Sequence, residues 1–203
     1  MSHFVYEDID YGEDEGECKL ELINGEISGK PKYEIIGGIK FIMSPAPNIA
    51  HATIVSRIIT SFTNYILDNN VRGAVFGDNT DVYFTEDEHY MPDISVVCNP
   101  EILKNGKKIL GAPDLVAEVL SLSTMKNDLG KKKNIYEKYG VKEYWIVDQW
   151  AKRIEVYHLV KDKFELDDVY MVIDEAGAKT DIKVSIFEDL TIDIRKIFKS
   201  WFS

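Results

Sequence analysis

The sequence predicts a single α/β domain, and three features of the chain support this. At 203 residues, of which 45% are hydrophobic, the chain is long enough for one substantial core and too short to favour two. Apolar residues recur at three-and-four spacing over 51–70, which is the pattern of an amphipathic helix. The segment 114–148 then reads as strand, helix and strand, the order of a crossover unit in a mixed β-sheet flanked by helices.

Residues 1–30 are expected to form an acidic N-terminal arm, and residues 31–203 the domain itself. Carboxylates crowd the arm while apolar residues are few; the acidic residues before Lys19 are Glu7, Asp8, Asp10, Glu13, Asp14, Glu15 and Glu17. Segments 20–27 and 32–39 each combine alternating apolar residues with an Asn-Gly or Gly-Gly turn signal. Both are therefore predicted to contribute to hairpins.

The remaining elements follow the long helix. Strand-like runs occupy 74–76, 81–84, 94–98 and 114–120, of which the last two are expected at the centre of the sheet. A second helix is predicted over 126–139 and ended by Gly140, because glycine readily adopts the left-handed backbone found at helix ends. The rest of the domain is predicted as strands at 143–148 and 154–160, a closing pair near 163–173 and 181–186, and a short helix near 192–198.

Two classes of protein are disfavoured by what the chain lacks. No apolar run approaches the roughly 20 residues that cross a bilayer, and the first residues lack the positive-then-apolar order of a secretory signal. A cytoplasmic protein without a membrane contact is therefore expected. Cys18 and Cys98 have neither the number nor the spacing of a disulfide framework or a zinc site, so both are expected to be free thiols.

Charge gives a mixed indication about nucleic-acid binding. A net charge of −11 argues against the broad basic surface of a strong nonspecific binder. Seven lysines nevertheless gather in one part of the chain: Lys104, Lys107, Lys108, Lys126, Lys131, Lys132 and Lys133. They form either a phosphate-binding patch or an ordinary solvated helix face, and the composition does not decide between the two.

Two carboxylates stand at positions where an acidic side chain is costly. Asp93 leads into the apolar run 94–98, and Glu118 interrupts the apolar run 115–120. A buried carboxylate needs a cation, a hydrogen-bond network or a metal ion, and one divalent ion would serve both acids. Mg²⁺ takes oxygen ligands from one or two carboxylates, which suits phosphate chemistry. Taken singly, Asp93 is more often a turn or capping residue, and Glu118 is more often a barrel-rim or interface residue.

A second group of polar residues follows on the predicted helix. Asp128, Lys132 and Tyr136 are spaced i, i+4 and i+8, so they share one helix face. Together with the two acids they favour a catalytic site, whereas alone they would indicate a surface ion pair beside a core tyrosine.

These motifs, taken in order, resemble the Uma-two family of restriction endonucleases, over roughly residues 31 to 198. The resemblance is carried by segments 111–124, 128–136 and 139–148 and by the upstream motifs Tyr33-Glu34, Met43-Ser-Pro-Ala-Pro47, His51 and Met91-Pro-Asp93. Several motifs in the same order are far more specific than any one of them.

The resemblance implies a restriction-endonuclease-like core of the PD-(D/E)xK type. In such a core Asp93 and Glu118 bind Mg²⁺, for which Mn²⁺ can substitute. The implied reaction is hydrolysis of a phosphodiester bond in nucleic acid, and the expected substrate is DNA. The superfamily's lysine lies two residues after the strand acid, where this chain has Leu120. The position that matches the family's relocated lysine is Lys132, which is implied to orient the attacking water or to stabilise the developing phosphorane charge.

The resemblance also implies roles for two upstream residues. Glu34 matches an early acidic position and could add a ligand or hold a water, with a charge at a strand edge as the alternative. His51 could approach the scissile phosphate, with helix capping or packing as the alternative. Ser123 and Thr124 are expected to be capping residues, and Asp128 is expected to pair with Lys132.

Two other functions fit the same residues. Leu120 and the acidic total favour a nuclease-derived module that binds nucleic acid or a protein without cutting. Alternatively, the acidic arm docks on a basic partner or masks the chain's own lysines. A homodimer is expected from exposed edge strands and from the apolar pair Tyr144-Trp145, because nucleases that cut two strands often use two active sites.

Overall fold

The computed structural model describes residues 21–22, 25–26, 32–42, 48–104, 106–121, 128–173 and 179–200, those at 21–26 and 128–129 by their backbone alone. Most of the predicted acidic arm lies outside the described residues, as do Cys18, Lys126 and the predicted caps Ser123 and Thr124. The predicted pairing of Asp128 with Lys132 is likewise beyond what is described.

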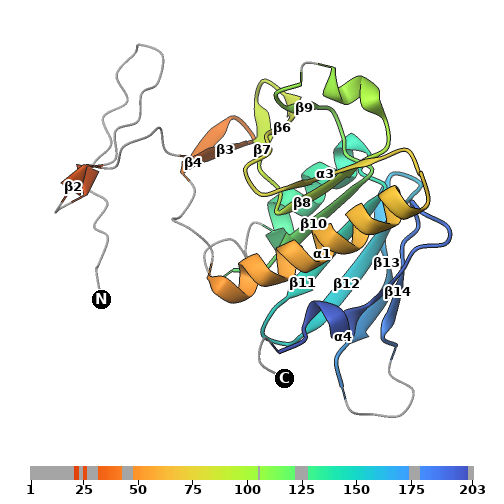
Figure 1. Ribbon diagram of the computed structural model, residues 1–203. Helices are drawn as coiled ribbons and strands as arrows, with labels where there is room; N and C mark the ends of the chain where they lie inside the picture. Colours follow the sequence, from red (N-terminus) through yellow and green to blue (C-terminus); the bar gives the residue numbers. More distant parts are fainter. Residues whose placement is uncertain are drawn as a thin grey trace.

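A six-stranded mixed sheet forms the centre of the molecule, in the order β13-β12-β11-β10-β8-β5 (Figure 1). Its strands are β5 (Ala74–Gly77), β8 (Ile94–Val97), β10 (Leu115–Val119), β11 (Glu143–Asp148), β12 (Arg153–Val160) and β13 (Lys163–Met171). Strands β10 and β11 are parallel and joined by a helical crossover, while the other neighbours are antiparallel. The predicted α/β class and the interior positions of β8 and β10 are confirmed.

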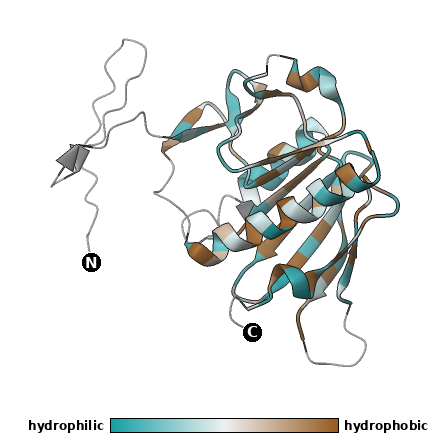
Figure 2. Cartoon of the chain, viewed as in Figure 1, coloured by the Kyte–Doolittle hydropathy of each residue, from teal (hydrophilic) through white to brown (hydrophobic). Residues whose placement is uncertain are grey.

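Helix α1 (Ile49–Asp68) covers one face of this sheet. It begins two residues before the predicted start because the Asn48 side chain accepts a hydrogen bond from the His51 backbone N–H at 2.8 Å. Ile58 and Phe62 of its apolar stripe are fully buried in the main core. Figure 2 shows the hydrophobic residues of the central strands running beneath the helix.

The opposite face of the sheet is covered by α3 (Lys133–Tyr139), which the π-helical turn Asp128–Lys132 precedes. Side chains alternate along β10, so 115, 117 and 119 pack in the core under α1, whereas 116 and 120 pack with Tyr136 of α3. Gly140 ends α3 with a φ of 84°, as predicted. The prediction of a regular helix is wrong for 128–132, where the backbone forms a wider turn.

A second, five-stranded sheet packs beside α3, in the order β4-β3-β7-β6-β9. Its strands are β3 (Tyr33–Ile36), β4 (Ile39–Ile42), β6 (Val82–Thr85), β7 (Glu88–Tyr90) and β9 (Ile109–Leu110), and the 3-10 turn Pro100–Leu103 precedes β9. Gly37 and Gly38, with φ of 60° and 75°, make the tight turn between β3 and β4, as the Gly-Gly signal predicted. The shorter pair β1 (Glu21–Leu22) and β2 (Gly25–Glu26) forms a separate hairpin.

The C-terminal part differs from the prediction in its pairing. Strand β13 pairs with β12, and β14 (Asp181–Lys183) pairs with β15 (Thr191–Asp193), which leads into α4 (Ile194–Ile197). The predicted closing pair of 163–173 with 181–186 is therefore wrong. Within the described ranges, none of the helices combines the length and apolarity needed to span a bilayer.

Candidate functional site

Asp93 stands directly before β8 and opposite Glu118 of the neighbouring strand β10. Ala117 of β10 pairs with Ile94 of β8 in antiparallel register, so the next position along the ladder sets Glu118 against Asp93. The backbone N–H of Val119 donates a hydrogen bond to Asp93 Oδ2 at 2.7 Å. The register of the sheet thus brings the two predicted acids together although 25 positions separate them in the sequence.

His51, in the first turn of α1, contacts the same oxygen of Asp93. Its Nε2 lies 3.2 Å from Asp93 Oδ2, and the histidine side chain is 6% exposed. Burial alone would lower the pKa of His51, but the hydrogen bond to Asp93 and the charge of that carboxylate outweigh it, so the pKa is raised. His51 therefore contacts Asp93 from its buried place in the first turn of α1, and its role toward the phosphate stays a prediction.

Glu118 lies on the face of β10 that α3 covers. Its Oε1 accepts a hydrogen bond from the Tyr136 hydroxyl at 2.6 Å and lies 3.2 Å from Lys132 Nζ. Both donors come from the face on which residues 132 and 136 were predicted to lie together. Burial and the charge of Glu118 raise the pKa of Tyr136 well above its ordinary value, so the phenol stays a donor.

Glu34 joins this group from β3 of the second sheet. Its Oε1 lies 2.9 Å from Lys132 Nζ and accepts a hydrogen bond from the Met91 backbone N–H at 3.0 Å. The residue is 5% exposed, because alternation along β3 points it and Ile36 inward. The alternative of a charge at a strand edge is therefore wrong. Glu34 also fixes the backbone just two positions before Asp93.

The clustered lysines do not share one environment. Lys132 is 2% exposed and belongs to the carboxylate group, so a solvated helix face is wrong for this residue. Its neighbours point elsewhere: Lys131 Nζ lies over the Phe41 ring at 5.0 Å, and Lys133 Nζ over the Tyr157 ring at 3.4 Å.

The donors fit a hard divalent cation such as Mg²⁺. Asp93, just before β8, and Glu118 of β10 offer carboxylate oxygens, the ligand type that Mg²⁺ prefers. Asp93 Oδ1 makes no hydrogen bond within the part of the chain that the structure describes, and the Asp93 side chain is 19% exposed, so this oxygen is open to a ligand. Among the described residues, no three or more of His, Cys, Asp and Glu cluster as a ready metal site, so water would have to complete the shell.

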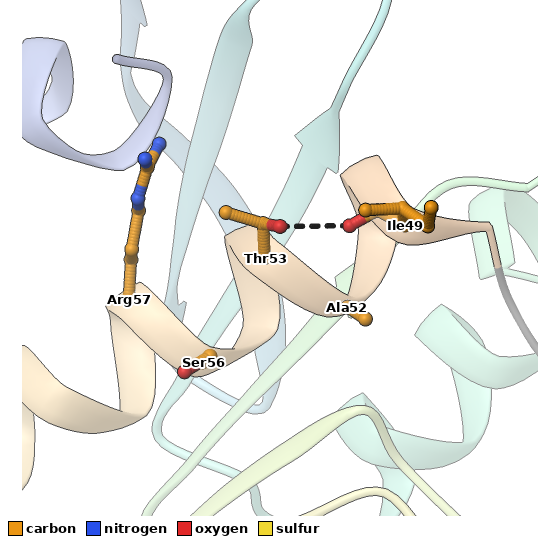
Figure 3. Close-up of a pocket in the computed structure, with 5 residues that line it drawn as sticks. All are labelled: Ile49, Ala52, Thr53, Ser56 and Arg57. Atoms are coloured by element: carbon orange, nitrogen blue, oxygen red, sulfur yellow. Dashed lines mark hydrogen bonds between the residues drawn. The ribbon is translucent and has the colours of Figure 1, made fainter. Parts of the chain in front are cut away.

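A surface hollow on α1 does not belong to this group of residues. Its lining is Ile49, Ala52, Thr53, Ser56 and Arg57, from the first turns of the helix (Figure 3). The Thr53 hydroxyl donates back to the Ile49 carbonyl at 2.8 Å, and Arg57 donates to the carbonyls of Ile197 and Lys199 at 2.9 and 2.6 Å. The Thr53 and Arg57 side chains are therefore used within the fold, and the hollow carries no carboxylate.

Two contacts of the site have only faint signals in the sequence. The i, i+4 spacing predicts that Tyr136 lies beside Lys132, but nothing local shows that its hydroxyl meets Glu118. Tyr90 donates to Glu88 Oε2 at 2.6 Å, and both are buried next to the group. In the sequence, the polar triplet 88–90 stands just before the Pro92-Asp93 motif. This triplet is the signal that could have indicated Glu88.

The residues predicted to form a dimer interface lie in the core of the protomer. Tyr144 and Trp145 are both fully buried, Tyr144 in the core beneath α3 and Trp145 in the core beneath α1. Any dimer must therefore use another surface. Cys98 is a free thiol, as predicted.

A solved structure shares this architecture. A crystal structure of a putative nuclease belonging to DUF820 from Anabaena variabilis superposes with a TM-score of 0.65, at 24% identity, and covers 83% of this chain and 90% of that one. At this identity the likeness shows the fold.

Two proteins of Synechocystis are similar in sequence. The uncharacterized protein sll1609 is 32% identical over 92 residues, which span 44% of this chain and only 52% of that protein. The uncharacterized protein slr1290 is 27% identical over 140 residues, 68% of this chain and 72% of that protein.

A family match covers most of the chain. The family is Uma2, described as "Putative restriction endonuclease", and it matches residues 19–194. The predicted motifs and the crossover that carries Glu118 and Lys132 all lie within the matched range. The chain belongs to the Uma2 family.

Proposed function

We propose that this protein is a Mg²⁺-dependent endonuclease that hydrolyses phosphodiester bonds, with DNA as its substrate. The observation that carries the proposal is the contact of Lys132 with Glu118. The lysine is absent from its usual place two residues after the strand acid, yet an ammonium from the next helix reaches the same carboxylate at 3.2 Å. Membership of the Uma2 family supports a nuclease over other phosphate chemistry.

In this proposal each residue has a defined task. Asp93 and Glu118 would hold the ion, which supplies Lewis-acid chemistry at the phosphate. His51 and the Val119 N–H fix the direction of the Asp93 carboxylate. Lys132 provides the positive charge that can orient a water or stabilise charge developing on the phosphate.

Substitution of Asp93 tests the proposal. We expect wild-type protein to nick supercoiled plasmid with Mg²⁺ or Mn²⁺ and not with chelator, and Asp93→Asn to lower the rate by at least about 100-fold, because a ligand loses its charge. Asp189→Asn is a matched control, since that aspartate lies in the turn between β14 and β15 and should leave the rate unchanged. Absence of metal-dependent cleavage on DNA and RNA substrates of either strandedness would refute the enzyme.

A nuclease-derived binding module is the second candidate. The observation in its favour is that Lys132 is held between two carboxylates rather than directed at an open surface. In that case the wild-type protein and the Asp93→Asn variant would bind nucleic acid with equal affinity, whether or not a divalent ion is present.

The proposal extends to the setting of the enzyme. We place it in the cytoplasm, with residues 31–203 as one domain. In this proposal two protomers cut the two strands. Sedimentation of the purified protein with and without duplex DNA measures whether two protomers associate.

A further inference from the structure

The Lys132 ammonium lies between two buried carboxylates. Its Nζ is 2.9 Å from Glu34 Oε1 and 3.2 Å from Glu118 Oε1, and none of the three side chains is more than 7% exposed. Because an isolated buried carboxylate is strongly disfavoured, the ammonium stabilises the charged form of both acids. The protein therefore carries a counter-ion for this pair within its own chain.

Glu118 is also the carboxylate proposed to bind the divalent ion. A carboxylate oxygen that already faces an ammonium is a weaker ligand, because a second cation is repelled and the existing contact must lengthen or break. Lys132 is tied to its place by Glu34, whose Oε1 is in turn fixed by the Met91 N–H at 3.0 Å. The contact between Lys132 and Glu118 is therefore preorganised. It has to lengthen or break before Glu118 can bind an ion.

We infer that Lys132 is the resident counter-ion of the Glu34 and Glu118 pair and competes with the divalent cation for Glu118. Glu34 is then a positioning residue that holds one side of the ammonium. This inference rests on the proposed function, since it concerns the same metal site. It gives Lys132 opposite effects on two quantities: the ammonium weakens metal binding while it supports cleavage.

Replacement of Lys132 by Met separates the two effects. The variant keeps most of the aliphatic stem and leaves two acids that need a cation, so we expect it to bind Mn²⁺ about tenfold more tightly than wild type while cleavage is lost. Mn²⁺ binding is measured without nucleic acid, by titration calorimetry and by the electron paramagnetic resonance signal of free Mn²⁺.

Lys131→Met is the matched control. It removes the same charge from the neighbouring position, but Lys131 faces the Phe41 ring, so its Mn²⁺ affinity should stay within about twofold of wild type. If Lys132→Met does not fold, Lys132→Gln removes the charge while keeping a hydrogen-bond donor, and the rise in melting temperature with Mn²⁺ replaces the titration.

The outcomes distinguish this inference from the proposed function. Tighter Mn²⁺ binding by the Lys132 variant alone supports the competition. Equal or weaker binding than wild type, or equal tightening in the Lys131 control, overturns the competition and leaves the metal site intact. Failure of every protein to bind Mn²⁺ removes both the metal site and the competition.

Discussion

Tyr136 restricts how the Glu118 carboxylate can turn. Its hydroxyl donates to Oε1 at 2.6 Å from a fully buried position. Tyr136→Phe keeps the ring and leaves a buried acceptor with one donor fewer, so we expect the free energy of unfolding to fall by about 1–3 kcal/mol. Urea denaturation measures the loss.

Another tyrosine of the same helix provides the comparison for that substitution. Tyr139 stacks on Phe84, with 4.8 Å between the ring centroids, and its hydroxyl makes no hydrogen bond within the described part of the chain. Tyr139→Phe should change the unfolding free energy by less than about 0.5 kcal/mol. Similar losses of unfolding free energy at both positions would mean that the hydrogen bond from Tyr136 to Glu118 adds no stability of its own.

At the scale of single residues, the sequence predicted the acids better than their partners. Asp93 and Glu118 could be found because a carboxylate at or within an apolar run is costly, and that cost is visible locally. The partners come from elsewhere: Glu34 from the second sheet, His51 from the first turn of α1. No spacing rule connects residues 34, 118 and 132, so only the family resemblance indicated that they belong to one group.

At the scale of elements, the features set by strong local chemistry were predicted and the pairing of the C-terminal strands was not. Gly140 and the apolar stripe of α1 are local signals, and both were interpreted correctly. Strand β7 was missed because Glu88, His89 and Tyr90 look like a polar loop. In the structure each is buried and bonded, His89 to Asp81 at 2.8 Å. The pairing of β14 with β15 depends on contacts that no short pattern encodes.

The left-handed end of α3 gives a prediction at this scale. Gly140 has φ of 84°, and a Cβ added there would meet no atom within 4 Å, so the cost of Gly140→Ala is confined to the backbone. We expect a loss of about 1–2 kcal/mol in unfolding free energy, because an L side chain disfavours this conformation. Thermal and urea unfolding give the value.

Gly130 is the internal control for that loss. It lies in the π-helical turn without a positive φ, and an added Cβ there also meets nothing within 4 Å. Gly130→Ala should therefore leave stability unchanged or raise it by up to about 1 kcal/mol, since alanine restricts the unfolded chain. Destabilisation by both substitutions to the same extent would show that the helical crossover tolerates no added methyl group at either end, independent of φ.

At the scale of the whole molecule, the site joins three separate parts of the fold. The central sheet provides Glu118, the second sheet Glu34, and the crossover helix Lys132. This explains why the fold class was predictable while the site was only partly so. The α/β class follows from the order of elements, whereas the site depends on how the second sheet packs against α3.

The acidic charge of the whole molecule gives the last prediction. Seven carboxylates and no lysine or arginine precede Lys19, so changing these seven to their amides would bring the net charge from −11 to −4. Because phosphate backbones are repelled by a negative protein, we expect the neutralised variant to bind duplex DNA about tenfold more tightly at low salt. The Debye length shrinks from about 10 Å at 0.1 M salt to about 3 Å at 1 M, so the difference should fade as salt rises. Fluorescence anisotropy with labelled duplex across a salt series measures both effects.

A variant that lacks residues 1–18 should behave like the neutralised one if charge is the cause. Superimposable salt curves for the wild type and the neutralised variant would show that the acidic residues do not act on the nucleic-acid surface at all.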